Sequence, residues 1–346
     1  MGDIPKNVLE TLVRDGKIVD EIILQYLRSR KDETDLHHKM MVEYATRAGK
    51  HLRPTLCIET CGAFEGNPNS AHRIASALEI FQQWILMHDD IEDDSDERRG
   101  KPAMHKMYGV PLAVNAGDAL HIRMWEFIFE EIKKFDQTKA YLILDEFVSM
   151  ANRCTQGQTI DVGWVANNKW DIDFKDYMKM SELKTAGYTF VTPVRLGAII
   201  AGADKGVYPV IDKLGFKLGI VFQIQDDILN LVGEESKYGK EIAGDLWEGK
   251  RTLMLIHLLK NASEADKKEF LRIMSKPRHE KTKDEIQKVL EMIKKYKSID
   301  YAKKIASEMA EESKRIFKDE LSPLMKESEH KQFIANIMDF IINREV

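Results

Sequence analysis

Apolar residues recur at intervals of three and four positions along most of this chain, with polar residues between them. That spacing places the apolar side chains on one face of an α-helix, whereas a half-buried strand would alternate at every second residue. Convincing alternating runs are hard to find. The pattern predicts helices over Lys6–Arg28, Leu36–Ala48, Pro54–Phe64, Ser70–Asp93, Pro111–Phe135, Lys139–Trp164, Phe174–Gly202, Val207–Val232 and Thr252–Lys260.

Clusters of glycine, proline and asparagine separate these segments, as at Gly66–Asn69 and Gly202–Gly206. The chain has no low-complexity linker and no repeat of fixed period. Beyond Ser263 it is rich in Lys and Glu, with apolar residues at helical spacing, which is typical of amphipathic helices that pack on a core. We therefore predict an all-α protein in which residues 1–346 form a single domain, one large helical bundle.

Composition narrows the functional classes. The 346 residues are 43% hydrophobic and 32% charged, and the net charge of −5 gives no indication of nucleic-acid binding. Three cysteines are too few for a disulfide framework, which favours a reducing compartment. The N-terminus lacks a signal-peptide pattern, and no apolar run reaches the roughly 20 residues that span a bilayer. We expect a cytoplasmic protein with no transmembrane segment.

An acidic segment carries the first functional indication. Seven of the nine residues from Asp89 to Glu97 are acidic, and they follow an apolar run. If the helix continues to Gly100, Asp89 and Asp93 lie on one face, as do Asp90 and Asp94. Like charges repel at this spacing, and the helix dipole adds negative charge at a C-terminal end. A bound cation would relieve both effects, and magnesium fits because it takes carboxylate, water and phosphate oxygens.

A second acidic pair, Asp226 and Asp227, also follows apolar sequence, and Asn230 lies four residues after Asp226. One acidic helix end is commonly just solvated, but two that face each other would hold a small cluster of magnesium ions. Phosphate would complete such a site. Basic residues suited to phosphate stand beside turn or glycine signals at Gly49–Pro54, Arg98–Gly100, Lys184–Thr185, Gly239–Lys240 and Gly249–Lys250. Their combined charge exceeds the need of one diphosphate, which indicates two diphosphate substrates.

With these residues the sequence resembles the trans-isoprenyl diphosphate synthase family (short-chain polyprenyl synthases). The resemblance runs from about residue 49 to residue 252, with the motifs in the family's order. They are Gly-Lys-x-x-Arg-Pro at Gly49–Pro54, DDxxD followed by Arg-Arg-Gly-x-Pro-x-x-His at Asp89–His105, Gly-Gln-x-x-Asp at Gly157–Asp161, Lys184–Thr185, Phe-Gln-x-x-Asp-Asp at Phe222–Asp227, Gly239–Lys240, Asp245 and Gly249–Thr252.

The resemblance implies an all-α bundle with a deep central apolar pocket. It implies head-to-tail condensation of isopentenyl diphosphate with an allylic diphosphate, with loss of pyrophosphate. Asp89, Asp93 and Asp226 would hold about three magnesium ions, supported by Asp161. The allylic diphosphate would contact Arg98, Lys184, Lys240 and Lys250, and isopentenyl diphosphate would contact Lys50, Arg53, Gln82 and Arg99. Lys184, Thr185 and Gln223 would be catalytic, the last two stabilising the allylic cation; released pyrophosphate would take the final proton.

Two positions depart from the family pattern. Asn230 stands where many relatives carry a third Asp, and an amide oxygen is a weaker metal ligand; we expect activity to survive. His51 occupies a position often filled by Arg, and we expect this to weaken isopentenyl diphosphate binding slightly.

In similar enzymes the residues before the first DDxxD motif form the floor of the chain-elongation pocket. Here these are Phe81, Trp84 and Ile85. An aromatic residue five positions before Asp89 with a smaller one at four resembles enzymes that stop at C20. We therefore predict geranylgeranyl diphosphate as the product, with farnesyl diphosphate (C15) as the alternative. If Phe81 and Trp84 are ordinary core residues, they do not set the length.

Two other functions remain open. A class I terpene cyclase shares DDxxD, but it has no second diphosphate to engage Lys50, Arg53 and Arg99. A non-catalytic partner subunit typically lacks the metal-binding acids that this chain retains. The family resemblance also implies a homodimer.

Overall fold

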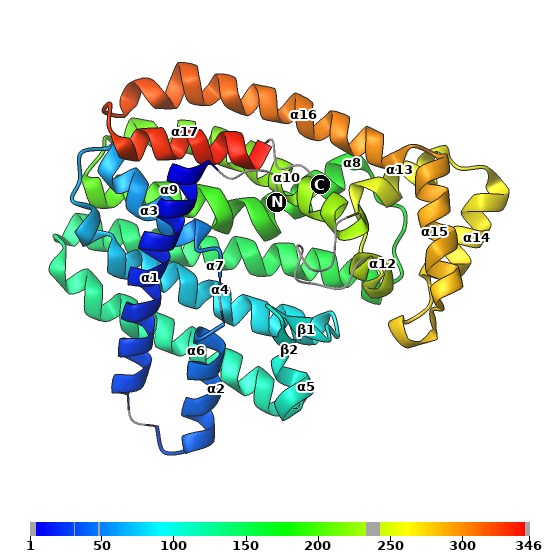
Figure 1. The fold of residues 1–346 in the computed structure, drawn as a ribbon, viewed down its shortest axis with the longest axis horizontal. Helices are drawn as coiled ribbons and strands as arrows, with labels where there is room; N and C mark the ends of the chain where they lie inside the picture. The colour runs from blue at the N-terminus through cyan, green and yellow to red at the C-terminus, as the bar shows by residue number, and fades with distance from the viewer. Residues whose placement is uncertain (1–4, 31, 48, 233–242, 343–346) are drawn as a thin grey trace.

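The computed structural model of the protein describes residues 5–30, 32–47, 49–232 and 243–342, and nearly all of its regular structure is helical (Figure 1). The prediction of an all-α fold is confirmed. The described part of the chain has two strands, β1 (Glu97–Arg98) and β2 (Lys101–Pro102), which pair antiparallel. Between them Arg99 and Gly100 have φ of +55° and +72°, as a type I′ hairpin turn requires.

The acidic segment lies among the helices of the first half of the chain. They are α1 (Lys6–Ser29), α2 (Asp35–Ala45), α3 (Leu52–Ala63), α4 (His72–Glu92), α5 (Met104–Tyr108), α6 (Val110–Glu131) and α7 (Gln137–Ala166), with 3₁₀ turns η1 (Pro68–Ser70) and η2 (Ile132–Lys134).

The second half continues through a long helical run to the C-terminal layer. Its elements are α8 (Phe174–Ser181), η3 (Glu182–Val191), α9 (Thr192–Ala201), η4 (Lys205–Val207), α10 (Tyr208–Val232), α12 (Gly244–Glu248), α13 (Leu253–Asn261), α14 (Glu264–Met274), η5 (Arg278–Glu280), α15 (Lys283–Lys295), α16 (Ser298–Ile316), η6 (Phe317–Leu321), η7 (Ser322–Leu324) and α17 (Glu329–Ile342). In Figure 1, α16 and α17 lie along one long edge, and α14 and α15 lie at the end away from α1 and α2.

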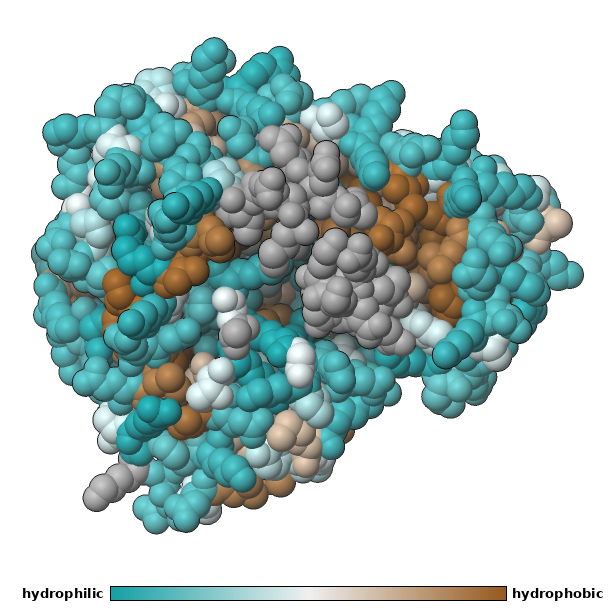
Figure 2. Space-filling view, in the orientation of Figure 1, coloured by the Kyte–Doolittle hydropathy of each residue, from teal (hydrophilic) through white to brown (hydrophobic). Residues whose placement is uncertain are grey.

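Buried apolar side chains of the described residues form three clusters in the core. The first gathers side chains from α1 to α4, α6, α7 and α9; the second lies between the end of α10 and α13 to α16; the third joins α3, the start of α10 and α17. The face shown in Figure 2 is mostly hydrophilic with several apolar patches. None of the helices in the described ranges is long and apolar enough to cross a membrane.

The predicted helix Phe174–Gly202 is a continuous helical run, but its middle is the ten-residue π-helix η3. This element packs against both α7 and α10. Its backbone approaches two glycines so closely that a Cβ on Gly157 would lie 2.2 Å from Lys184 N, and one on Gly219 would lie 2.3 Å from Ala186 Cα. Glycine is therefore required where α7 and α10 hold η3 between them. π-Helical turns often mark functional sites.

One local prediction about the acidic segment is wrong. The helix α4 ends at Glu92, within one residue of its predicted end at Asp93, and does not extend toward Gly100. Asp94 has φ of +50° and leaves the helix, so it does not share a face with Asp90. Its carboxylate instead accepts a 2.7 Å hydrogen bond from Lys106. Repulsion among the clustered carboxylates at a helix C-terminus favours this early end.

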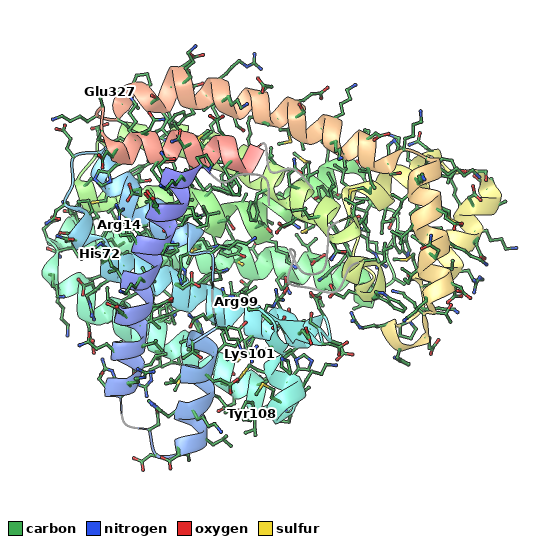
Figure 3. The ribbon with its side chains drawn as sticks, viewed as in Figure 1. Arg14, His72, Arg99, Lys101, Tyr108 and Glu327 are labelled. Carbon is green, nitrogen blue, oxygen red and sulfur yellow. The ribbon has the colours of Figure 1, made fainter. Side chains whose placement is uncertain are left out.

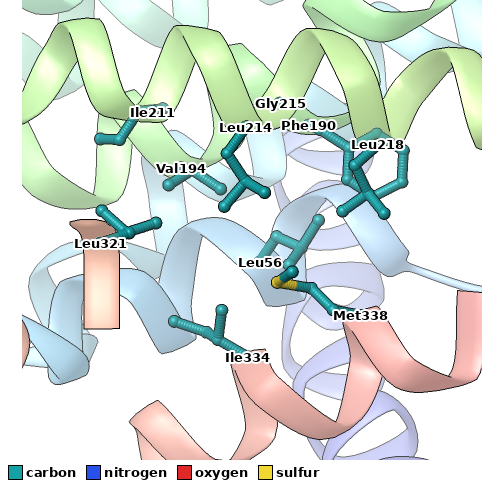
Figure 4. A pocket seen from close by; sticks show the side chains of 10 residues that line it. All are labelled: Leu56, Phe190, Val194, Ile211, Leu214, Gly215, Leu218, Leu321, Ile334 and Met338. Atoms are coloured by element: carbon teal, nitrogen blue, oxygen red, sulfur yellow. The ribbon is translucent and has the colours of Figure 1, made fainter. Parts of the chain in front are cut away.

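A small apolar cavity lies between α3, α9, α10 and α17 (Figure 4). Its volume is about 20 Å³, enough for roughly one water molecule but far too small for a prenyl chain. The residues that line it are Leu56, Phe190, Val194, Ile211, Leu214, Gly215, Leu218, Leu321, Ile334 and Met338. It is therefore not the deep central pocket, which stays a prediction.

Candidate active site

The end of α4, the hairpin that follows it and η3 meet around Asp89. Gln158 Nε2 of α7 donates to Asp89 Oδ1 at 3.1 Å, and Lys184 Nζ donates to the same atom at 3.4 Å. Arg98 of the hairpin reaches back to Asp89 Oδ2 at 3.3 Å and to Asp90 Oδ1 at 2.7 Å. Asp90 and Arg98 are both buried, so this pair fixes the hairpin against the helix.

Asp161 of α7 is the shared partner of two lysines. Lys184 Nζ lies 2.5 Å and Lys250 Nζ 3.0 Å from Asp161 Oδ2. Burial alone would raise the pKa of Asp161, but the two ammonium groups outweigh it and lower the pKa to about 2. The carboxylates of Asp161, Asp89 and Asp93 raise the pKa of Lys184 and Lys250 against the opposing effect of burial. Asp161, Lys184 and Lys250 are thus charged at neutral pH.

Asp93 lies at the edge of a larger cavity. Its Oδ1 accepts a hydrogen bond from Lys250 Nζ at 2.5 Å. Burial is the main reason that its pKa is raised, to about 6. The adjacent cavity, of about 230 Å³, is lined by Glu92, Asp93, Val162, Val165, Ala166 and Glu248. Three acidic side chains from α4 and α12 therefore border an open space next to the lysine pair.

The donor atoms here suit a hard divalent cation. Among the residues that the structure describes, no three His, Cys, Asp or Glu side chains are close enough to hold an ion alone. Magnesium needs only one or two carboxylates, with water and phosphate oxygens at its other positions. Asp89 near the end of α4 and Asp93 at its C-cap carry oxygen atoms of this kind, one helical turn apart. The residues therefore fit such an ion when a diphosphate is present.

The second acidic motif lies near the end of α10, and its three polar residues differ in their surroundings. Asp226 is partly exposed, whereas Asp227 and Asn230 are buried. Asn230 Oδ1 accepts a hydrogen bond from Asp245 N at 3.0 Å, and its backbone oxygen accepts one from Ala243 N at 2.7 Å. The Asn230 side chain thus binds the start of α12. Lys240 lies outside the described residues.

Two cations near Lys250, Arg251 and Lys281, anchor the chain around the end of α12. Arg251 Nε donates to Lys169 O at 2.9 Å, and its guanidinium stacks over Trp170 at 4.0 Å. The buried Lys281 donates to Leu246 O and Trp247 O, each at 2.8 Å, at the C-terminal end of α12. Burial and the nearby Arg251 lower the pKa of Lys281 to about 8. These cations neutralise the carbonyl end of the helix.

Thr185 and Gln223, predicted to be catalytic, are in direct contact. Thr185 Oγ1 donates to Gln223 Oε1 at 2.6 Å, joining η3 to α10. Thr185 follows Lys184 in the π-helix, so the lysine that pairs with Asp161 and the hydroxyl that meets Gln223 come from adjacent positions. The three predicted catalytic residues therefore lie on two packed elements.

The residues predicted for isopentenyl diphosphate lie on α3, α4 and the hairpin. Arg53 is buried, donates to Thr189 at 2.8 Å and stacks over Tyr188 at 4.1 Å; its Nε has no hydrogen-bond partner among the described residues. Gln82 is partly buried on α4, and Lys50 is exposed.

Arg99, labelled in Figure 3, is tied to two neighbours of the same region. It donates to Arg47 O at 3.0 Å and to the buried Glu79 at 3.4 Å. Arg47 in turn donates to Pro102 O at 3.0 Å, which fixes the hairpin. His51 does not lie free beside these residues: its Nε2 is 2.8 Å from Asp20 Oδ1 of α1, and its φ is +50°.

The proposed floor residues lie in the first apolar cluster. Phe81 and Trp84 meet edge to face at 5.3 Å, and Trp84 stacks on His121 of α6 at 3.8 Å. Phe81 is fully buried, Trp84 nearly so, and Ile85 is partly buried. Their role in chain length stays a prediction.

Several contacts were not anticipated from the sequence. Gln158 belongs to a quoted motif without an assigned role, and its amide bridges Asp89 and Glu92. Tyr177, Arg47 and Lys281 stand outside the quoted motifs; they donate hydrogen bonds to Asp227, Pro102 O and Leu246 O respectively. For Gln158, its place in the Gly-Gln-x-x-Asp motif could have indicated a role in the site. Nothing in the local sequence marks the other three.

Known proteins resemble this chain in sequence and in fold. The family model for polyprenyl synthetase matches residues 35–293. The chain is 31% identical over 340 residues to the short chain isoprenyl diphosphate synthase of Methanothermobacter thermautotrophicus, covering 98% of this chain and 99% of the relative. It is 34% identical over 266 residues to the geranylgeranyl diphosphate synthase of Saccharolobus solfataricus, covering 77% and 78% of the two chains.

A solved structure gives the same result for the fold. The crystal structure of geranylgeranyl pyrophosphate synthetase from Pyrococcus horikoshii superposes with a TM-score of 0.83 at 31% identity, covering 97% of this chain and 99% of that one. The sequence match to the Methanothermobacter relative and this structural match both extend over almost the whole chain. The protein therefore belongs to the polyprenyl synthetase family.

Proposed function

We propose that this prenyltransferase condenses isopentenyl diphosphate head to tail with allylic diphosphates and releases geranylgeranyl diphosphate (C20). The observation that carries the proposal is the alternation of charge around Asp161, where two lysines from distant segments converge on carboxylates from α4 and α7. Such a site offers cations to a diphosphate and oxygen ligands to a metal at the same place.

Magnesium fits the carboxylates of Asp89, Asp93, Asp161 and Asp226, and when bound it would neutralise charge on the leaving diphosphate. About three ions per site remain part of the proposal. Lys184 and Lys250 form ion pairs with Asp161 and Asp93. With magnesium bound to these carboxylates, both ammonium groups and Arg98 would contact the allylic diphosphate.

The chain's own residues supply the rest of the reaction environment. Lys184 and Lys250 stay charged because the pKa of each is raised. As the carbon–oxygen bond breaks, the Gln223 carbonyl and the Thr185 hydroxyl would offer lone pairs to the allylic cation. We nominate no protein general base, because the departing pyrophosphate is a suitable acceptor for the final proton. Lys240 is included in the diphosphate site from its motif alone.

Isopentenyl diphosphate would bind at Lys50, Arg53, Gln82 and Arg99. The unpartnered Nε of buried Arg53 supports this, because a buried donor without an acceptor is costly until a ligand provides one. Arg99 and the hairpin are fixed by Arg47 before any ligand arrives. Preorganised cations of this kind lower the ordering cost of binding.

The C20 product length rests on Phe81, Trp84 and Ile85 as the floor. The stack of Trp84 on His121 supports a rigid wall at this depth of α4. Farnesyl diphosphate remains the alternative product. The basic residues Lys50, Arg53 and Arg99 disfavour a terpene cyclase, which has no second diphosphate to bind. The retained metal-binding acids disfavour a non-catalytic subunit.

We also propose one domain for residues 1–346 and a homodimer. Helices α3 and α9 each contribute to two of the three apolar clusters, which supports one continuous core. Apolar side chains on α6 and α7 are exposed, which favours a partner subunit on this face. They are Val110, Leu112, Val114, Ile122, Phe129, Tyr141 and Val148. A cytoplasmic location stays a prediction from composition.

The test is incubation of purified protein with magnesium, labelled isopentenyl diphosphate and each of dimethylallyl, geranyl and farnesyl diphosphate. We expect labelled C20 product. Formation of a cyclic hydrocarbon without consumption of isopentenyl diphosphate would identify a cyclase instead. Activity that appears only when a partner protein is added would identify a subunit.

A further inference from the structure

Four residues from three elements form a hydrogen-bond chain that ends at the proposed reaction centre. Tyr177 of α8 donates its hydroxyl to Asp227 Oδ2 at 2.8 Å, and Gln223 Nε2 donates to Asp227 Oδ1 at 2.7 Å. Thr185 of η3 donates to the carbonyl oxygen of the same Gln223 amide. Tyr177, Asp227 and Thr185 are buried, so water competes little for these bonds.

We propose that Asp227, held in place by Tyr177, is a positioning residue that keeps the carbonyl oxygen of Gln223 turned toward Thr185. The inference rests on the proposed function, because an allylic cation is the species that would require an oxygen rather than an NH₂ group at this point.

The chemistry of the carboxylate determines the orientation of the amide. Both oxygens of Asp227 accept hydrogen bonds, Oδ2 from Tyr177 and Oδ1 from Gln223, so the side chain selects the Nε2 end of the Gln223 amide. In the reversed orientation the two oxygens would face each other, and Thr185 would lose the acceptor for its hydroxyl. Gln223 alone could turn either end of its amide toward Thr185. Because Asp227 binds the Nε2 end, the Oε1 end points to Thr185.

The orientation has a direct electrostatic consequence. The amide oxygen carries partial negative charge and stabilises a developing cation, whereas the NH₂ end carries partial positive charge and opposes it. Fixed dipoles in a buried site act strongly on the transition state because they do not reorganise. Losing the fixed orientation should therefore slow the chemical step and leave diphosphate binding unchanged.

The competing role for Asp227 is metal binding, since it belongs to the second acidic motif. Its two oxygens already accept hydrogen bonds from Gln223 and Tyr177, and its side chain is nearly inaccessible. Successive residues on a helix point about 100° apart, so Asp226 and Asp227 face different neighbours. Asp226, the more exposed of the two, is the one proposed to hold metal.

The experiment measures single-turnover rates, the KM of each diphosphate and the magnesium dependence for wild type, Asp227→Asn and Tyr177→Phe. In Asp227→Asn the new amide can pair with either end of Gln223, so we expect a rate loss of about 10- to 100-fold. Both KM values and the half-saturating magnesium concentration should stay within about twofold of wild type. Tyr177→Phe should show a smaller loss of the same kind. Tyr301→Phe, in α16 and outside the chain of bonds, is the matched control.

A double-mutant cycle with Gln223→Ala separates the two roles. If Asp227 acts through Gln223, then Asp227→Asn should have little further effect in the Gln223→Ala background. An additive loss, or a higher magnesium requirement in Asp227→Asn, would overturn the positioning role. If that variant fails to fold by circular dichroism, Tyr177→Phe in both backgrounds decides the question. Inactive wild type would instead overturn the proposed function, and this inference with it.

Discussion

Alanine at Gly157 is the substitution that most directly perturbs the packing of η3 against α7. The new Cβ would lie 2.2 Å from Lys184 N and 2.5 Å from Lys184 Cα, so backbone atoms rather than flexible side-chain ends must move. Real contacts of this kind need more than 3 Å, so the two elements must separate by about 1 Å. Overpacking of this type costs about 1–3 kcal/mol of stability.

The same displacement moves Lys184 and Thr185 away from their partners on α7 and α10. A shift of about 1 Å at a catalytic group lowers turnover by roughly 100-fold. We therefore expect Gly157→Ala to unfold at lower denaturant concentration and to lose most of its condensation activity. The measurements are urea unfolding followed by circular dichroism and the rate of labelled isopentenyl diphosphate incorporation.

Gly163→Ala provides the matched control on the same helix. A Cβ at Gly163 meets no heavy atom within 4 Å, so only helix propensity changes. We expect a gain in stability of up to about 1 kcal/mol and wild-type activity. If Gly157→Ala behaves like Gly163→Ala in both assays, the close approach of η3 does not position the site and the reasoning is refuted.

Three further predictions follow from the site. Trp84→Ala and Phe81→Ala should each lengthen the product, seen by chromatography; unchanged C20 product from both would exclude them as the floor. Asp161→Asn should destabilise the metal-free protein by about 3–5 kcal/mol, because it leaves Lys184 and Lys250 short of a partner. The pKa of Asp161 is lowered from 3.8 to about 2, so its protonation can remove roughly 2–3 kcal/mol of this stabilisation. Wild type should lose that part as pH falls from about 4 to about 2, whereas the variant should not; parallel pH profiles would contradict this. Asn230→Asp should keep activity within about threefold of wild type, because a carboxylate can still accept the hydrogen bond from Asp245 N. Asn230→Ala removes that acceptor and should lower activity about tenfold or more. A large change in magnesium affinity for Asn230→Asp would instead identify Asn230 as a metal ligand.

The helical fold and much of the site were accessible from the sequence. The three-to-four spacing of apolar residues predicts α4, α7 and α10 within a few residues, because that spacing sets which face is buried. Asp89, Lys184 and Lys250 belong to separate sequence motifs, and the fold brings them together. Their separation along the chain does not determine how far apart their side chains lie.

Other features depend on long-range packing that no local pattern records. The π-helical form of η3 arises where α7 and α10 approach through Gly157 and Gly219, and its sequence reads as an ordinary helix. The early end of α4 depends on Asp94 finding Lys106. Asn230 reads as a weakened metal ligand, yet its amide oxygen binds the start of α12.

The most direct measurement of the central claim is product sizing from purified protein, magnesium, labelled isopentenyl diphosphate and each allylic diphosphate. The proposed function predicts label in a C20 diphosphate from every starter, lost when magnesium is removed. A C15 product would keep the prenyltransferase and place the floor nearer Asp89. No incorporation from any starter in the presence of magnesium would contradict the account.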